Sequence, residues 1–258
     1  MPVVYSAIIP HPPLLIPFFQ SKNQQLLKDL LLSINQVKEH LYHKNIDTVI
    51  IISPHSTTTN EIISINSAAT FNLDFSTFGD LSVYPEQKND LDMIGLIHDH
   101  INNLVILNNQ QAVGYDQAIP IALLSQNLPV KYVLINVANA TIEQIKNFTT
   151  LLSPLLHLQH QRIALIASGD LSHQLNQMNT KVKFLASDNI ILEWLKNKSN
   201  FDIDQKLITL TEFSDAGICL AAPLITLLGL INEQNYICNI LRTDNLAGIN
   251  YLVAEFII

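Results

Sequence analysis

Three histidines follow apolar runs of the sequence, and an aspartate accompanies one of them. VVYSAIIPH ends at His11, DTVIIISPH ends at His55, and RIALIASGDLSH carries Asp170 and then His173. Neutral imidazole is a common ligand of divalent metal ions, and an imidazole that stays free can move protons near neutral pH. These residues therefore predict a metal site with two histidine ligands and a third histidine as acid and base, provided that the fold brings them together.

Rigid or small residues flank each of these positions. Prolines stand beside His11 and His55 in PHPP and SPH, where they fix the direction of the turn, and Gly169 permits a sharp exit from the third run. A single histidine after a strand is more often a loop residue bonded to backbone. The shared position of three such histidines, with the Asp-x-x-His pair, favours a common pocket.

The apolar runs also predict the strands that would position these residues. Runs rich in Val, Ile and Leu without polar alternation are typical of strands buried on both faces of a parallel sheet, and they occur at 3–9, 48–52, 131–137 and 162–167. Segments with helical spacing lie between them at 25–43, 90–104 and 142–158, where Pro154 is expected to mark a boundary or a kink. The alternation predicts an α/β fold: a single domain, 1–258, with an open, mostly parallel central sheet flanked by helices on both faces. Since ligands bind at the carboxyl ends of such strands, the three histidines can be neighbours.

The rest of the chain continues the pattern less regularly. Helices are expected at 184–198 and 214–231, and a last strand at 249–258, at a sheet edge. The region 56–89 is weakly patterned, and its FGDLSVYP, 78–85, is interpreted as part of a long loop or lid that crosses the surface.

Composition narrows the class of protein. Hydrophobic residues make up 48% of the chain, enough for a large core, and the net charge of −8 argues against nucleic acid as a partner. No apolar stretch has the length of a membrane span, and no secretory signal is recognised. Cys219 and Cys238 are too few for a disulfide framework. We expect a cytoplasmic protein, and a homodimer is a reasonable assembly.

Six short motifs, in this order, resemble one known family. They are PHPPLLIP at 10–17, SPHS at 53–56, FG at 78–79, ASGDLSH at 167–173, APLITLLG at 222–229 and YLVA at 251–254. Together they resemble the class III extradiol ring-cleaving dioxygenase superfamily, catalytic B-subunit type, which also contains the Memo-like proteins. ASGDLSH is the most specific of them.

The resemblance implies a reaction and a cofactor. In that family two histidines and a carboxylate hold a non-haem ferrous ion, which binds a catecholic substrate and dioxygen, and another histidine acts as acid and base. By match of motif, His11 and His55 resemble the metal ligands and His173, beside Asp170, the acid/base residue. The resemblance thus implies an oxidoreductase that opens an aromatic ring beside the diol and takes part in aromatic compound catabolism.

Two positions depart from the family pattern. Ile218 stands opposite the glutamate that commonly supplies the third ligand, and Asp215 or Cys219, one helical turn apart, would have to replace it. Cys219 matches a cysteine of Memo-like relatives, and a thiolate favours zinc over ferrous ion. Gln117, in YDQAIP, occupies the place of a histidine that relatives often carry; its amide can donate a hydrogen bond but cannot carry a proton.

The departures keep a rival function open: a non-catalytic or zinc-binding, Memo-like scaffold or binding protein with a degenerate site. Glu212 ranks below Asp215 because a carboxylate in a first helical turn commonly serves the helix dipole. Ser168 and Ser172 suggest a hydrolase only weakly, since no G-x-S-x-G elbow is present. The remaining histidines are expected on solvated helix faces or near helix ends: His40, His43, His98, His100, His157 and His160.

Overall fold

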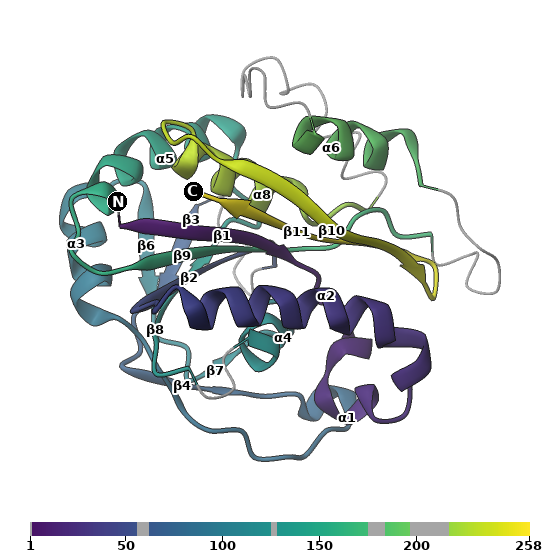
Figure 1. Ribbon diagram of the computed structural model, residues 1–258. Coiled ribbons are helices and arrows are strands. Elements are labelled where there is room, and N and C mark those ends of the chain that lie inside the picture. The colour runs from purple at the N-terminus through teal and green to yellow at the C-terminus, as the bar shows by residue number, and fades with distance from the viewer. Residues whose placement is uncertain (1, 56–61, 125–127, 175–183, 197–216) are drawn as a thin grey trace.

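The computed structural model describes residues 2–55, 62–124, 128–174, 184–196 and 217–258. Eight strands of this part of the chain form one central sheet (Figure 1). In spatial order they are β10 (Ile237–Leu246), β11 (Ile249–Ile257), β1 (Val3–Ile9), β9 (Ile163–Ser168), β2 (Thr48–Ser53), β8 (Lys131–Asn136), β3 (Ile63–Asn66) and β6 (Val105–Asn108). Strands β1, β9, β2 and β8 run parallel to one another, and β3 runs parallel to β6. Three neighbouring pairs are antiparallel: β10–β11, β11–β1 and β8–β3.

Each central strand divides its side chains between two apolar cores. In β2, Ile50 and Ile52 point into one core and Val49 and Ile51 into the other, since successive side chains of a strand face opposite ways. Both faces must therefore be covered. The predicted class, an α/β fold with a mostly parallel sheet between helical layers, is confirmed.

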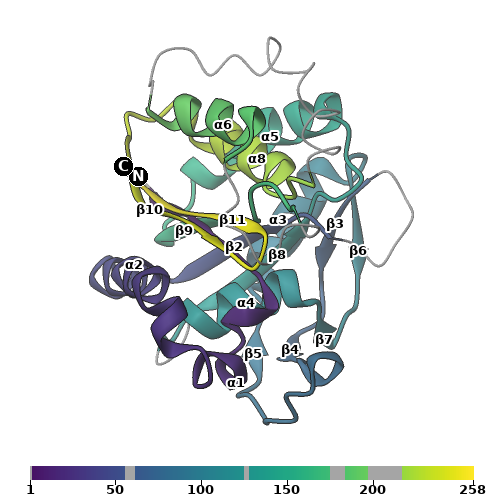
Figure 2. The same ribbon diagram turned by 90° about the vertical axis from the view of Figure 1, so that its right-hand side faces the viewer.

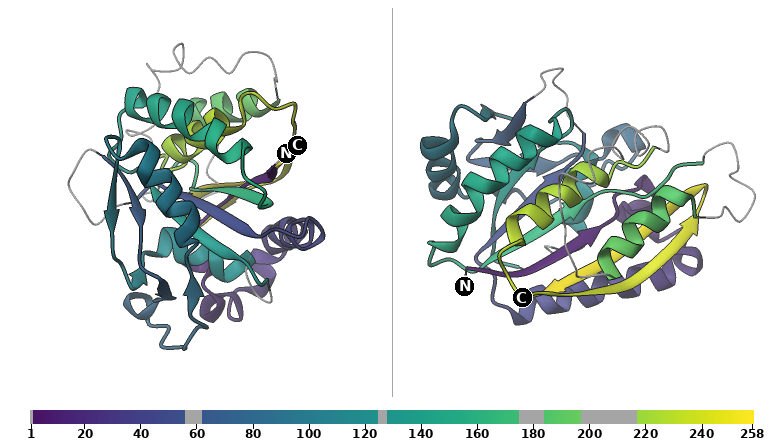
Figure 3. Two further views of the ribbon diagram at one scale, coloured as in Figure 1. Left: turned by 90° about the vertical axis from the view of Figure 1, so that its left-hand side faces the viewer. Right: turned by 90° about the horizontal axis from the view of Figure 1, so that it is seen from above.

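The two helical layers can be followed in Figures 2 and 3. One face carries α3 (Leu91–Ile101), α5 (Ile142–His157), α6 (Ala186–Lys196) and α8 (Ala221–Ile231), whose apolar side chains share one core. The opposite face carries α2 (Gln24–His43) and α4 (Tyr115–Leu124). None of the helices in the described residues combines the length and hydrophobicity that crossing a membrane requires.

Short elements connect these layers. The chain leaves β1 through the 3-10 helix η1 (Pro13–Leu15) and the single turn α1 (Pro17–Gln20). A three-stranded sheet lies apart from the central one and consists, in spatial order, of β5 (Gln87–Lys88), β4 (Thr70–Leu73) and β7 (Ala112–Val113).

Three details of the C-terminal half differ from the sequence-based expectations. Strand β11 is not the sheet edge, because β10 pairs along its outer side; β10 mixes polar and apolar residues and gives no clear pattern. Helix α8 begins at Ala221 rather than at 214, and residues 217–220 precede it as a turn. Pro154 does not end its helix, since α5 continues to His157.

The weakly patterned region holds more structure than expected. Residues 56–61 lie outside the described residues, but β3, β4, the 3-10 helix η2 (Ser76–Phe78) and β5 follow within 62–89. Residues 79–86 form the expected surface loop, in which Leu81 and Val83 are almost fully exposed. A lid function for this loop stays a prediction.

Candidate metal centre

The carboxyl ends of three adjacent strands bring the chemistry-bearing residues together. Strands β1, β9 and β2 are neighbours and parallel, and Ile9 pairs with Ser168 at the end of the first pair. His11 and His55 each follow their strand by two residues, and their ring centroids lie 5.2 Å apart although 44 residues separate them in sequence. The parallel sheet thus creates the proximity that the sequence predicted.

Cys219 completes a group of three potential ligands. One ligand atom each from His11, His55 and Cys219 lies within 4.8 Å of the others, and Cys219 Sγ is 3.5 Å from His11 Nε2. A tetrahedral ion with metal–nitrogen bonds of about 2.0 Å and metal–sulfur bonds of about 2.3 Å holds such ligand atoms roughly 3.5 Å apart. The donor set therefore fits one small divalent ion.

Hydrogen bonds fix which nitrogen of His11 faces this group. Ser168 Oγ donates its proton to the backbone carbonyl of Asp116, so it can only accept from His11 Nδ1, 2.8 Å away. The proton of the neutral His11 ring then resides on Nδ1, and the Nε2 lone pair points toward Cys219. This tautomer, assigned from the hydrogen-bond network, is the one that metal binding through Nε2 needs.

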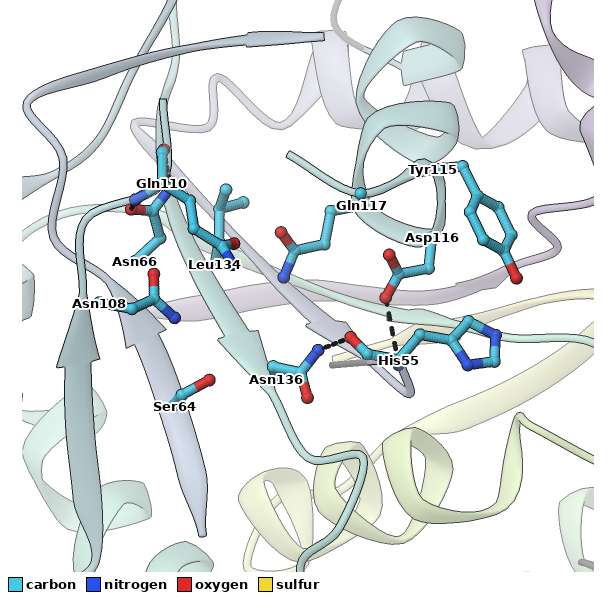
Figure 4. A pocket seen from close by; sticks show the side chains of 11 residues that line it. His55, Ser64, Asn66, Asn108, Gln110, Tyr115, Asp116, Gln117, Leu134 and Asn136 are labelled. Carbon is cyan, nitrogen blue, oxygen red and sulfur yellow. Dashed lines mark hydrogen bonds between the residues drawn. The ribbon is translucent and has the colours of Figure 1, made fainter. Parts of the chain in front are cut away.

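His55 is held through its backbone and its ring. Its N–H donates to Asp116 Oδ2 at 3.2 Å, and its carbonyl accepts from the amide of Asn136 (Figure 4). The ring stacks on Tyr115, with centroids 5.6 Å apart and planes 30° from parallel. Burial, followed by the nearby His11, lowers the pKa of His55, so its imidazole is neutral and available as a ligand at neutral pH.

The turn before α8 delivers Cys219. The Leu220 N–H donates to the Asp170 carbonyl at 3.1 Å, and the Asp170 N–H points at Cys219 Sγ, also at 3.1 Å. Gly169 makes this approach possible, because a Cβ there would lie 2.4 Å from Leu220 Cα. Burial, with the nearby Asp170, raises the pKa of the Cys219 thiol well above its usual range.

Ile218, which stands where the family commonly has the glutamate ligand, and the two carboxylate candidates are not in the ligand group of the described residues. Ile218 is buried in the apolar core beneath α8, so an aliphatic side chain suits its place. Asp215 and Glu212 lie outside the described residues.

Asp170 and His173 adjoin the same thiol. Ligand atoms of Asp170, His173 and Cys219 also lie within 4.8 Å of one another. Asp170 is buried; its Oδ1 accepts the His11 N–H, and its Oδ2 lies 3.9 Å from His11 Nε2 and 3.8 Å from His173 Nε2. Within the described residues, His173 Nε2 is buried without a hydrogen-bond partner.

A buried carboxylate that the sequence did not single out holds this turn. Asp188, in α6, accepts hydrogen bonds from the N–H and the hydroxyl of Ser172, from the Leu185 N–H and from the Asn250 amide. A fully buried carboxylate with four donors positions its neighbours firmly. Nothing local marks Asp188, since a first-turn aspartate is ordinary in a helix.

The amino end of α4 forms one wall of the site. Gln117 is buried and donates to Ser53 Oγ at 2.9 Å, at the end of β2. Tyr115 contacts the rings of His11, His55 and Phe78, the phenylalanine of the FG motif. Burial, then Asp116 and Cys219, raises the pKa of Tyr115 to about 12, so its phenol stays protonated. The motif containing Gln117 was the available signal for Tyr115 and Asp116.

Three of the remaining histidines bond to other groups. His100 bonds the Leu96 carbonyl in its own helix, and His157 bonds the Ser153 carbonyl. His40 lies near the end of α2, as expected, and also contacts the buried Glu255, with 2.6 Å between His40 Nδ1 and the carboxylate. Cys238 packs against the apolar core.

Comparison with known proteins gives three findings. The sequence model of one family, described as the catalytic LigB subunit of aromatic ring-opening dioxygenase, matches residues 5–254. Protein CA_C1420 of Clostridium acetobutylicum is 21% identical over 267 residues, which cover 96% of this chain and 56% of that protein; the chain thus spans little more than half of this relative. A crystal structure of the uncharacterized protein JW3007 from Escherichia coli K12 superimposes with a TM-score of 0.64 at 12% identity, over 98% of this chain and 99% of that one, which shows a shared fold.

Proposed function

Because this chain belongs to the family of the catalytic LigB subunit of aromatic ring-opening dioxygenase, we propose that it is a metal-dependent oxidoreductase that cleaves a catecholic ring beside the diol, with dioxygen as co-substrate. One observation carries the proposal: two imidazoles, a thiol and an Asp–His pair from distant parts of the chain converge at one edge of a parallel sheet. Such convergence of titratable groups at strand ends is characteristic of active sites.

The residues that would hold the metal are His11, His55 and Cys219. The neutral ring of His55 and the free Nε2 of His11 present lone pairs, and binding would displace the proton of the Cys219 thiol. A ferrous ion held there would supply open coordination positions for the diol and dioxygen and the electron density that their reaction requires.

Proton transfer falls to His173 in this proposal. Its Nε2 would accept the proton of a substrate phenol, and Asp170 Oδ2, 3.8 Å away, would stabilise the resulting imidazolium through its negative charge. The same Nε2 can return the proton to the product. The ring of Tyr115 lies against both His11 and His55 and would shield them from water in this proposal.

A second candidate function rests on Cys219. A thiolate in the ligand group suits zinc, and Gln117 cannot carry a proton where relatives have a histidine. These two residues favour a zinc-binding protein that retains the pocket but does not cleave rings.

Metal analysis and turnover separate the two candidates. The purified protein is assayed for bound metal, then reconstituted with ferrous ion without oxygen, and finally exposed to oxygen with a panel of catechols. A yellow ring-fission product supports the dioxygenase; bound zinc and no product from any catechol support the second candidate.

Two alanine variants test the division of roles. His55→Ala is expected to lose stoichiometric metal, whereas His173→Ala should keep the metal and lose turnover. His100→Ala, at an exposed position of α3, is the control and should change neither. Unaltered metal content in His55→Ala would contradict the ligand assignment.

A further inference from the structure

A pocket of about 250 Å³ opens beside His55 (Figure 4). Its size is close to the lower end of the range for small-molecule sites. Most of its polar lining consists of uncharged amides and a hydroxyl, contributed by Ser64, Asn66, Asn108, Gln110, Gln117 and Asn136. His55 lines this pocket and also supplies an imidazole to the ligand group, so the pocket adjoins the candidate metal centre.

Strand register gathers these side chains on one face of the sheet. Ser64 of β3 pairs with Asn136 of β8, and Asn66 pairs with Asn108 of β6. Residues paired across neighbouring strands point to the same side, so the four form one polar patch. Ser64 and Asn66 are buried on that patch, where leucine or valine would be the usual residue of a sheet core.

In the described part of the chain, the lining of the pocket offers no positive charge that could pair with an anion. Among the described residues that line it, none is lysine or arginine, and the charged side chain is that of Asp116. A ligand carboxylate would therefore enter without a partner and close to another carboxylate, which is costly in a partly desolvated site.

The pocket also offers an acceptor that is not used. Within the described part of the chain, Asn108 Oδ1 is buried without a hydrogen-bond partner. The terminal torsion of asparagine is soft, so a small rotation turns this oxygen toward a ligand. An amide N–H or a hydroxyl would satisfy it, whereas a carboxylate at neutral pH has no proton to donate.

We propose that this pocket, defined by the six polar residues named above, binds an uncharged hydrogen-bonding substituent of the substrate, such as a carboxamide or hydroxyl group, and rejects a carboxylate. The inference rests on the proposed function for the position of the catechol ring. It assigns to Asn108 a role in specificity.

Calorimetry with a matched pair of ligands tests this selectivity. The zinc-loaded protein is titrated with 3,4-dihydroxybenzamide, 3,4-dihydroxybenzoate and unsubstituted catechol, because zinc has no redox chemistry and should not support turnover. The amide is expected to bind at least about tenfold more tightly than the carboxylate, the effect of one buried polar group left unpaired. Equal or tighter binding of the carboxylate overturns the proposal.

Variants at one position add a second test. Asn108→Leu should weaken the amide about fivefold and leave catechol unchanged, the usual effect of one lost hydrogen bond. Asn35→Leu makes the same change on the exposed face of α2 and is the control. If Asn108→Leu does not fold, Asn108→Ser replaces it, and the amide should again lose more affinity than catechol. Equal losses for amide and catechol contradict the role of Asn108.

The experiment distinguishes failure of the pocket inference from failure of the proposed activity. Cleavage of catechol without any preference for the amide refutes the pocket inference alone. If the protein binds no metal, the same ligands are titrated onto the metal-free protein; a preference for the amide there supports the pocket while the dioxygenase proposal fails.

Discussion

Replacing Gly169 by alanine tests the contact that places Cys219 beside the two histidines. Gly169 follows β9 directly, and its N–H donates to the carbonyl of Ile9 at 3.2 Å. An added Cβ would lie 2.4 Å from Leu220 Cα and 2.9 Å from both Leu220 N and Leu220 Cβ. Cβ contacts under 3.0 Å are essentially never observed, and backbone atoms cannot rotate out of the way. The turn that carries Cys219 must therefore move.

The expected loss of stability in Gly169→Ala can be estimated from the clash of the added Cβ with Leu220. Overpacking of a fixed interior typically costs about 1–3 kcal/mol, and a clash with backbone belongs at the upper end, about 3 kcal/mol. For a chain of this length, that corresponds to a fall in Tm of roughly 6–12 °C. Because Cys219 adjoins Leu220, zinc affinity should fall by about 10–100-fold, as it does when supports of metal ligands are altered elsewhere.

The assay compares two glycine-to-alanine variants. Tm is measured by thermal unfolding of the metal-free protein, and zinc affinity by competition with a chelator. Gly95→Ala is the control: it lies within α3, its added Cβ meets no atom within 4 Å, and alanine should stabilise that helix by about 1 kcal/mol. If Gly169→Ala unfolds at the wild-type temperature and holds zinc as tightly, the close approach to Leu220 does not exist and the placement of Cys219 is wrong.

Two further predictions concern the pH dependence of zinc binding and the stability contributed by Asp188. Burial raises the Cys219 pKa above its usual range, so the thiol keeps its proton up to alkaline pH and must lose it on metal binding. Zinc affinity should therefore rise about tenfold between pH 8 and pH 9. Cys219→Ser should abolish most of this dependence of zinc affinity on pH. A flat profile for the wild type would argue against a thiolate ligand. Asp188→Ala removes the acceptor of four hydrogen bonds and should lower the free energy of unfolding by about 3 kcal/mol, measured in urea, with Asp92→Ala on the exposed start of α3 as the control. Equal stability of the two variants would show that the Asp188 contacts contribute little.

The sequence by itself determined the central strands and the positions of three histidines at their ends. Apolar runs without alternation fit only strands covered on both faces, and such strands end at a common edge when they are parallel. The pattern identifies the runs that precede His11, His55 and Asp170, and for that reason the sequence could assign these residues to the edge where the strands end.

Tertiary structure decided what local pattern does not encode. The apolar spacing runs through 214–231, and although Gly217 and Pro223 are compatible with a helix start between them, the fold decides that α8 starts at Ala221 and that Cys219 lies in the preceding turn. The polar pocket depends on the pairing of Asn66 with Asn108 and of Ser64 with Asn136. Such register comes from long-range packing of whole strands, and a shift of one residue would turn these amides to the opposite face.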